Sequence, residues 1–378
     1  MASLDNTDSQ VYSSVQDYYG KVLESSSDLK TNACTAGTKP TPYLCKIIST
    51  IPKAVNDKFY GCGNPIPLGI QGLDLLDLGS GSGRDCYLAA SLVGPKGSVT
   101  GVDMTDEQLQ TARGNIDEYA QTLGYQPNMR FLTGYIEDLR QTGVPDSSVD
   151  ICISNCVVNM SPDKRSVFKG VYSALRQGGE FHFSDMYADK RVSDEARKHK
   201  VLINEGMGGS LYVEDFEQMV REIGFVQPRV LAISHIKVYD QQLQSMVGDT
   251  KFYSITYRLF KLPKDSGELE EEKKRQEVLA QSAVYNGLID GQPDQYVLDI
   301  DNTFRRDVPC AVDADTLAIL RNSWLRKYFA FVPAQDSAGA GGSEWTSESA
   351  KPSTVELMRE TYEKSQKGCC DSTQQSCL

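Results

Sequence analysis

A run of glycines between an apolar stretch and a polar one is the first feature that could bind a ligand. In DLGSGSGRD, Asp77 precedes Gly79, Gly81 and Gly83, where a predicted strand becomes a helix. Glycines there let the backbone approach a ligand, and the N–H groups of a helix start face it. Twenty residues after Gly83, at the end of the next predicted strand, Asp103 is placed to bind both hydroxyls of a ribose. Together these residues indicate an adenosine site; a purely structural turn is the alternative.

The spacing also indicates which adenosine compound binds. Nicotinamide dinucleotide sites use G-x-G-x-x-G, whereas this run is G-x-G-x-G with an acid two residues before it. A nucleoside that carries an amino acid fits this pattern better than a dinucleotide does. After the third predicted strand, GYIEDL places Ile136 where it could flank an adenine, and Glu137 or Asp138 where either could accept from its amino group. The alternative for this segment is an ordinary capped helix start.

Ten cysteines offer a second kind of chemistry. The N-terminus has no basic start followed by an apolar run, so we expect thiols that are buried, catalytic or metal-binding instead of a disulfide scaffold. Cys156 lies just past a predicted strand's carboxyl end, where ligands of doubly wound folds bind. Cys62 lies between two glycines, which suits a ligand loop. The remaining interior cysteines are expected to be small buried hydrophobes: Cys45, Cys86, Cys152 and Cys310.

Three cysteines cluster near the C-terminus, at Cys369, Cys370 and Cys377. An adjacent pair disfavours an unstrained disulfide but allows chelation of a soft ion, and the third thiol is close enough to join. The alternative is a disordered tail with incidental thiols. Three histidines and the lack of any C-x-x-C pair argue against a structural zinc site.

Composition narrows the class of protein. The 378 residues carry a net charge of −12 and no basic run beside aromatics, so nucleic-acid binding is not expected. No apolar run approaches the length of a membrane span, and we expect a soluble cytoplasmic chain without a membrane partner. Hydrophobic content of 40% supports one large core plus a smaller unit.

Alternating strand and helix patterns predict an α/β fold. Strands are expected at 73–79, 97–104, in MRFLTGY, VDICISN and GEFHFSD, and in KFYSITYRLFKL; helices are expected at 106–124, in PDKRSVFKGVYSALRQGG up to its glycines, and in VEDFEQMVREIGF. We predict a doubly wound, seven-stranded Rossmann-like core at 71–262 after a cysteine-bearing helical segment at 1–70. A smaller α+β domain at 263–335 and a mobile Ser, Gly and Ala-rich tail at 336–378 complete the chain.

These motifs resemble those of the S-adenosylmethionine-dependent methyltransferases and, more narrowly, of the arsenite methyltransferase family. GCGNPIP, LDLGSGSGRDCY, VTGVDMT, GYIEDL, SNCVVNM, GGEFHFSDMYAD and GCCDSTQQSC follow the family's order over nearly the whole chain. The resemblance implies a cofactor site lined by Asp77, Gly79, Gly81, Asp103, Met104, Ile136, Glu137 and Asn155. It implies that trivalent arsenic is handled by Cys34, Cys62 and Cys156.

One thiol of the family pattern is missing. In the family the counterpart of NEGMGGSLY carries a fourth cysteine, at the position of Gly206 here. Three explanations are open. The chain belongs to a family branch whose third thiolate comes from elsewhere, the residue is an engineered substitution, or the protein has drifted to another substrate. The neutral thioether of Met207 is a poor ligand for trivalent arsenic, so Cys34 or glutathione is expected to provide the third sulfur.

Three functions follow as hypotheses. The first is arsenite methylation for arsenic detoxification, with glutathione or thioredoxin as thiol reductant, by a monomer. The second is methylation of carbon, oxygen or nitrogen in an organic metabolite, for which Cys62 and Cys156 would be dispensable. The third is a non-catalytic thiol protein that binds arsenic or zinc, for which Asp103 and the glycine turn would have no use.

Overall fold

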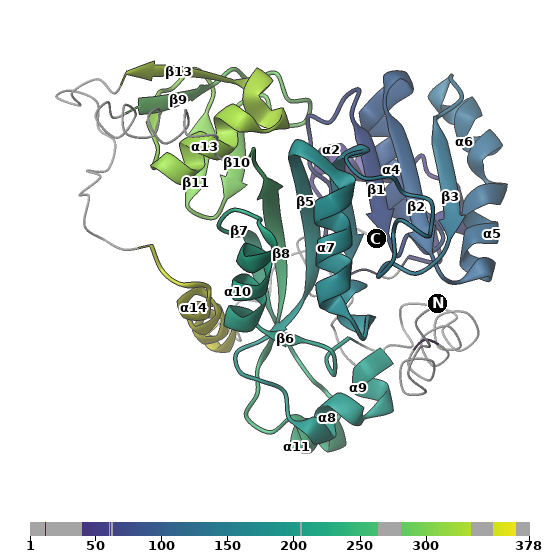
Figure 1. The fold of residues 1–378 in the computed structure, drawn as a ribbon, viewed down its shortest axis with the longest axis vertical. Helices are drawn as coiled ribbons and strands as arrows, with labels where there is room; N and C mark the ends of the chain where they lie inside the picture. The colour runs from purple at the N-terminus through teal and green to yellow at the C-terminus, as the bar shows by residue number, and fades with distance from the viewer. Residues whose placement is uncertain are drawn as a thin grey trace.

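Eight strands form one sheet in the computed structural model, which describes residue 12 and residues 40–59, 61, 63–204, 206–263, 281–333 and 351–367. Their bounds are β1 (Asp74–Leu78), β2 (Ser98–Asp103), β3 (Met129–Thr133), β4 (Val149–Asn155), β5 (Leu175–Ala188), β6 (Leu211–Tyr212), β7 (Arg229–Ile236) and β8 (Phe252–Lys261). The order is β3-β2-β1-β4-β5-β8-β7, with β6 paired to β5 off this path (Figure 1). Neighbours among β1 to β5 are parallel, whereas β8 is antiparallel to β5 and β7. The predicted doubly wound core is confirmed; seven strands form its continuous order, and β6 adds an eighth.

Helices lie on both faces of this sheet, and three short ones that follow β5 and β7 form a third cluster beyond the strand ends. They are α2 (Pro42–Ile48), α3 (Lys53–Asn56), α4 (Arg84–Val93), α5 (Asp106–Gly114), α6 (Ile116–Leu123), α7 (Lys164–Ala174), α8 (Asp194–Lys198), α9 (Lys200–Asn204), α10 (Val213–Ile223) and α11 (Gln241–Val247), with short 3-10 turns at Gly94–Lys96 and Val158–Met160. Successive β1 residues alternate between two cores: Leu75 packs with α4, whereas Leu76 packs with α7. Because both faces are covered, the central strands β4 and β5 are buried along nearly their whole length.

Local boundaries differ from the predictions in three places. The helix predicted at 106–124 is two helices, interrupted at Asn115, whose side-chain amide donates to the Thr111 carbonyl over 2.7 Å. The helix predicted to end on glycines stops at Ala174, because Leu175 is already extended and Gly178 lies inside β5. Strand β7 was not predicted; its burial pattern does not alternate, so periodicity provides little indication of it.

The predicted smaller α+β unit is also confirmed. It comprises β9 (Gln281–Tyr285), β10 (Gln295–Asp299), β11 (Asn302–Arg305), β12 (Cys310–Ala311), α13 (Ala314–Asn322), the 3-10 turn Trp324–Tyr328 and β13 (Phe329–Pro333). Buried Arg258 of β8 joins this unit to the core: it makes two contacts of 2.7 and 2.8 Å to Glu180 and donates to Tyr296 Oη over 2.7 Å. The predicted domain boundaries themselves stay predictions.

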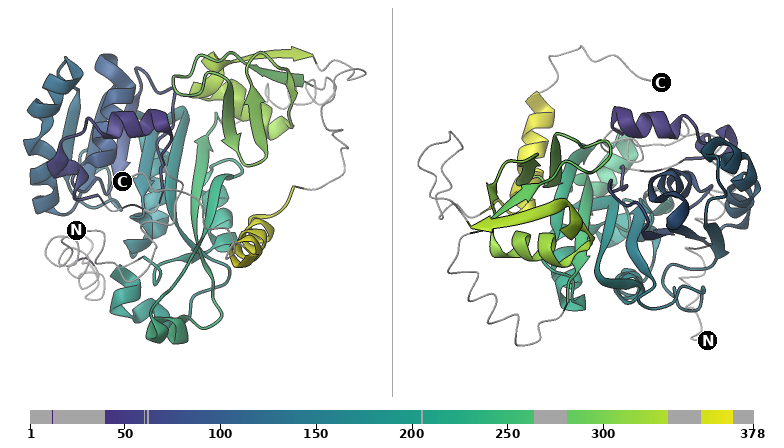
Figure 2. Two further views of the ribbon diagram at one scale, coloured as in Figure 1. Left: turned by 180° about the vertical axis from the view of Figure 1, so that it is seen from behind. Right: turned by 90° about the horizontal axis from the view of Figure 1, so that it is seen from above.

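The prediction of a mobile tail is wrong for residues 354–367. They form α14 (Thr354–Lys367), which packs on β7 and α10 (Figure 2). Met358 is buried, and Tyr362 lies edge-on to His235 with ring centroids 5.0 Å apart. Amino-acid composition gave the wrong prediction for this segment because the helix follows a long polar stretch and buries few side chains. The cysteines at 369, 370 and 377 lie outside the described residues.

The remaining cysteines divide by position. Cys86 and Cys152 are buried as predicted, and Cys310 is half-buried against the core. The prediction for Cys45 is wrong, because it lies on the outer face of α2 and is exposed. Among the described residues, no helix combines the length and the apolarity needed to cross a membrane.

Candidate active site

A pocket opens at the carboxyl ends of β1, β2 and β4. Its lining includes every residue predicted to bind the cofactor: Asp77, Gly79, Gly81, Asp103, Met104, Ile136, Glu137 and Asn155. Cys156 lines the same pocket. These residues come from four separate segments of the chain, and the parallel sheet brings them together at one edge. Their role in cofactor binding stays a prediction.

The glycine turn takes backbone angles that favour glycine. Gly79, Gly81 and Gly83 have φ values of 66°, 51° and 91°. A Cβ on Gly79 would lie 2.4 Å from a methyl group of Val157, so glycine also permits close contact with the residue after Cys156. The turn that faces the predicted cofactor therefore packs directly on the loop that carries a predicted arsenic ligand.

Asp103 fixes this turn as well as facing the pocket. Its two carboxylate oxygens accept from the backbone N–H groups of Gly81 and Thr105, each over 2.8 Å. Burial raises the pKa of Asp103, although these hydrogen bonds oppose the shift. Each oxygen keeps a further lone pair, so the carboxylate can still accept from ribose hydroxyls.

Asp77 lies in the most deeply buried part of the site. It is 3% exposed, and the Cys86 thiol donates to its Oδ2 over 3.2 Å. Burial raises the pKa of Asp77 well above its ordinary value, and the nearby carboxylate of Asp85 raises it further. Cys86 thus packs as predicted but also contacts a predicted cofactor residue.

The structure distinguishes the two acids proposed to bind adenine. Glu137 lines the pocket, where its Oε1 accepts from Tyr12 Oη over 3.0 Å and from the Ser161 hydroxyl. Asp138 is exposed, and its Oδ1 accepts from the N–H of Gln141 over 3.0 Å. Glu137 is therefore the acid that faces the pocket.

Cys156 follows β4 directly, as predicted. It has a φ of 59°, unusual for a residue other than glycine, and its N–H donates to the Ser184 carbonyl over 2.8 Å. Its side chain is buried and in a disulfide. The cysteines at 34 and 62, predicted to act with it, lie outside the described residues.

Asp185 at the end of β5 holds the loop that follows Cys156. Its Oδ2 accepts from the Asn159 N–H over 3.0 Å, and the Asn159 amide donates to the Met186 carbonyl. Burial raises the pKa of Asp185 to about 6. The loop is thus fixed at both ends, at Cys156 by Ser184 and at Asn159 by Asp185 and Met186.

The loop at Gly206 faces this cluster. Gly206 has a φ of 79°, and a Cβ built there would lie 2.3 Å from Cε of Met186. Met186, Met207 and Cys156 belong to one buried apolar cluster. The loop in which the resemblance implies a cysteine therefore lies beside the predicted metalloid site, in a backbone conformation that favours glycine.

Sequence analysis missed several polar side chains of the site, among them three near the start of α4. Ser82, Arg84 and Asp85 are buried and line the pocket. These three residues could have been predicted, because they end the glycine turn and start α4, and the start of a helix at this place faces a ligand.

The doubly wound sheet has its pocket at the carboxyl ends of its strands, where folds of this class bind their cofactors. The family model described as a methyltransferase domain matches residues 71–224, and that of the arsenite methyltransferase C-terminal domain matches residues 279–377. The chain is 42% identical over 333 residues to an arsenite methyltransferase of Mus musculus, spanning 88% of this chain and 86% of that protein. An arsenite methyltransferase of Aquipseudomonas alcaligenes is 43% identical, over 85% of this chain and 91% of its own length.

A solved structure extends the likeness to three dimensions. The crystal structure of an arsenic(III) S-adenosylmethionine methyltransferase from Chlamydomonas reinhardtii has a TM-score of 0.72 and 45% identity, covering 79% of this chain and 98% of that one. The chain belongs to the arsenite methyltransferase family.

Proposed function

We propose that this protein transfers methyl groups from S-adenosylmethionine to trivalent arsenic held by its thiols. One observation carries the proposal: Cys156 lines the same pocket as the glycine turn and Asp103. A soft sulfur ligand for arsenic and the predicted cofactor site therefore line one pocket. In this proposal Cys156 acts with Cys34 and Cys62.

The chemistry of arsenic suits such a site. Trivalent arsenic is soft, binds three sulfur ligands in a pyramid and keeps a lone pair. That lone pair attacks the sulfonium methyl group in line; the As–C bond forms as the S–C bond breaks, and S-adenosylhomocysteine leaves. No general base is required, because arsenic gives up no proton.

The electron balance requires a reductant. Methylation formally raises arsenic from the trivalent to the pentavalent state, and two thiols supply two electrons when they form a disulfide. Cys156 is in a disulfide, and in this proposal a disulfide at this position is the oxidised form that the reductant must open. A thiol system, glutathione or thioredoxin, then restores the dithiol. Repeated turnover gives methylated and dimethylated arsenicals. The proposal includes a role in arsenic detoxification, a cytoplasmic location and a monomeric protein.

The test is an assay with arsenite, labelled S-adenosylmethionine and glutathione, with and without thioredoxin. Cys62→Ser and Cys156→Ser should each abolish methyl transfer and leave cofactor binding intact, because a hydroxyl is a hard ligand. Cys45→Ser is the matched control, since its thiol is exposed. Transfer to an organic metabolite that survives both substitutions would establish the alternative methyltransferase function instead.

Cofactor binding is tested separately at Asp103. Asp103→Ala should weaken S-adenosylmethionine binding by about 1.5 to 3 kcal/mol, the range for hydrogen bonds to a charged group. Calorimetry without arsenic measures this directly. Unchanged affinity in the folded variant would remove the ribose assignment and leave the thiol site unaffected.

A further inference from the structure

We propose that Asp85 is a positioning residue: acting through Arg84 and Asn155, it fixes Phe59 and Gly63, which flank position 62 in the sequence, beside the loop of Cys156. The inference rests on the proposed function, because it concerns how two arsenic ligands from distant parts of the chain are brought into register. The residues involved lie in the first turn of α4, at the end of β4 and at the glycines on either side of position 62.

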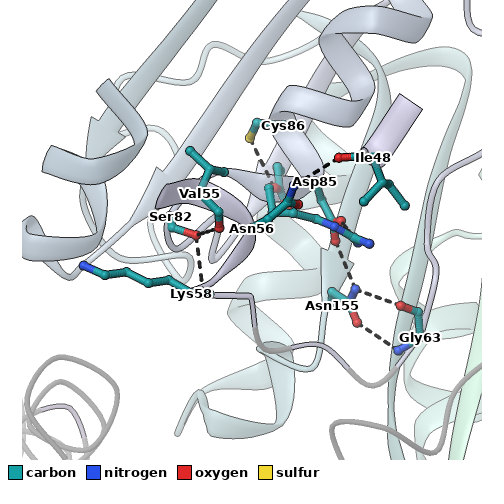
Figure 3. A network of polar contacts seen from close by, with 11 residues as sticks. Ile48, Val55, Asn56, Lys58, Gly63, Ser82, Asp85, Cys86 and Asn155 are labelled. Atoms are coloured by element: carbon teal, nitrogen blue, oxygen red, sulfur yellow. Dashed lines mark hydrogen bonds and ion pairs between the residues drawn. The ribbon is translucent and has the colours of Figure 1, made fainter. Parts of the chain in front are cut away.

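Asn155 links β4 to Gly63 through both polar atoms of its amide. Its Oδ1 accepts from the Gly63 N–H over 3.1 Å, and its Nδ2 donates to the Gly63 carbonyl over 3.1 Å (Figure 3). The same Nδ2 donates to Asp85 Oδ2 over 3.0 Å. Because a carboxylate only accepts, Asp85 sets which way the amide points, and that orientation is the one that pairs with both groups of Gly63.

Asp85 is also linked to Phe59, on the other side of position 62 in the sequence. Its Oδ1 accepts from Arg84 over 2.7 Å, and the Arg84 guanidinium lies 3.9 Å from the centre of the Phe59 ring. Arg84 and Asp85 are both buried, so these contacts are shielded from water and are stronger than surface pairs. One carboxylate is therefore connected to Phe59 on one side of Cys62 and to Gly63 on the other.

The glycines on either side of position 62 show how closely the chain there lies on the sheet. A Cβ on Gly61 would be 2.6 Å from Asn155 Nδ2, and a Cβ on Gly63 would be 2.2 Å from Ser184 Oγ. The carbonyl of the same Ser184 accepts from the Cys156 N–H over 2.8 Å. Gly63 and Cys156 thus contact one residue, so a displacement of Gly63 changes its position relative to the loop of Cys156.

The charge of Asp85 suits this role. It lies in the first turn of α4, where a carboxylate is stabilised by the helix N-terminus. Asp85→Asn keeps the size of the side chain, but an amide oriented to accept from Asn155 turns its own NH₂ towards Arg84. One of the two links must be lost, and either Phe59 or Gly63 is released.

The experiment measures arsenic binding without cofactor. Phenylarsine oxide needs two neighbouring thiols, so it reports on their register and not on methyl transfer. The reduced full-length protein is titrated with Cys34 and the three tail cysteines replaced by serine, so that those thiols do not compete with the pair formed by Cys62 and Cys156. Asp85→Asn should weaken binding by about tenfold, the effect of one charged hydrogen bond. Asp57→Asn is the matched control, because its ion pair with Lys53 is exposed.

The outcomes separate the two proposals. Affinity unchanged in Asp85→Asn, with binding that still depends on Cys62, would overturn the positioning role and leave the proposed function intact. Binding that is retained in Cys62→Ser would refute the arsenic-ligand assignment itself. If Asp85→Asn does not fold, Asn155→Ser tests the same link, because it removes both hydrogen bonds to Gly63; unchanged affinity there overturns the proposal equally.

Discussion

Gly206 allows a quantitative test of why this chain lacks the cysteine of its family pattern. Its φ of 79° is one that other residues adopt at a cost of about 1 to 2 kcal/mol. Its N–H donates to the Ile203 carbonyl over 2.9 Å, and its own carbonyl accepts from the Ser210 hydroxyl over 3.2 Å. The turn is therefore fixed at both ends and cannot readily change its backbone angles to accept a side chain.

A side chain at this position also meets Met186. The Cβ would lie 2.3 Å from Met186 Cε, closer than any real contact, so the methionine must move. Met186 is 1% exposed in a packed cluster, and leaving its rotamer costs about 0.5 to 1.5 kcal/mol. We expect Gly206→Ala to lower the free energy of unfolding by about 1.5 to 3.5 kcal/mol in total.

Gly72 provides the matched control. Its φ is 78°, and a Cβ there meets nothing within 4 Å. Gly72→Ala therefore carries the backbone cost alone, about 1 to 2 kcal/mol. Urea unfolding of both variants isolates the contribution of Met186 as their difference. Equal losses in the two variants would refute the argument that Met186 restricts position 206.

Gly206→Cys then adds a thiol to the same strained backbone. Compared with Gly206→Ala, it should bind trivalent arsenic more tightly if the loop faces the metalloid, and fluorescence titration with arsenite measures this. The alanine variant removes strain from the comparison. No gain in affinity over Gly206→Ala, with both proteins folded, would show that the loop does not contribute a ligand.

Three further predictions concern stability. Arg258→Met should lower the free energy of unfolding by about 3 to 5 kcal/mol in urea, because it removes the guanidinium that neutralises buried Glu180 and leaves that carboxylate only Trp324 and His182 as partners; adding Glu180→Leu should recover most of the loss, and no recovery would contradict this account. Deleting α14 should lower the free energy of unfolding by at least about 1.5 to 3 kcal/mol through the loss of Met358 burial alone, whereas truncation after Lys367 should lower it little. Equal Tm values for the two truncated proteins would show that α14 does not stabilise the core. Burial raises the pKa of Asp185 from 3.8 to about 6, so the folded state holds this proton longer and the stability from this group falls as pH rises between those values; Asp185→Asn should flatten that part of the pH profile of unfolding.

Much of the site could be predicted from local sequence alone. The glycine turn and Asp103 are separated by one strand and one helix, and their chemistry depends on backbone features that short motifs specify. The position of Cys156 after a strand follows in the same way, because the carboxyl ends of parallel strands lie at one edge of a sheet. These residues identify the pocket before any contact is known.

Contacts between distant segments were decided by the tertiary structure. Asn155 and Gly63 are 92 residues apart, and no periodicity or motif relates them. Helix α14 packs on β7 through a few side chains after a long polar stretch, so its composition resembles that of a tail. The local sequence at Gly206 contains no indication of Met186, which approaches from β5. Side-chain pairing of this kind depends on which surfaces meet when the whole chain closes, and a residue's immediate neighbours in sequence do not specify that.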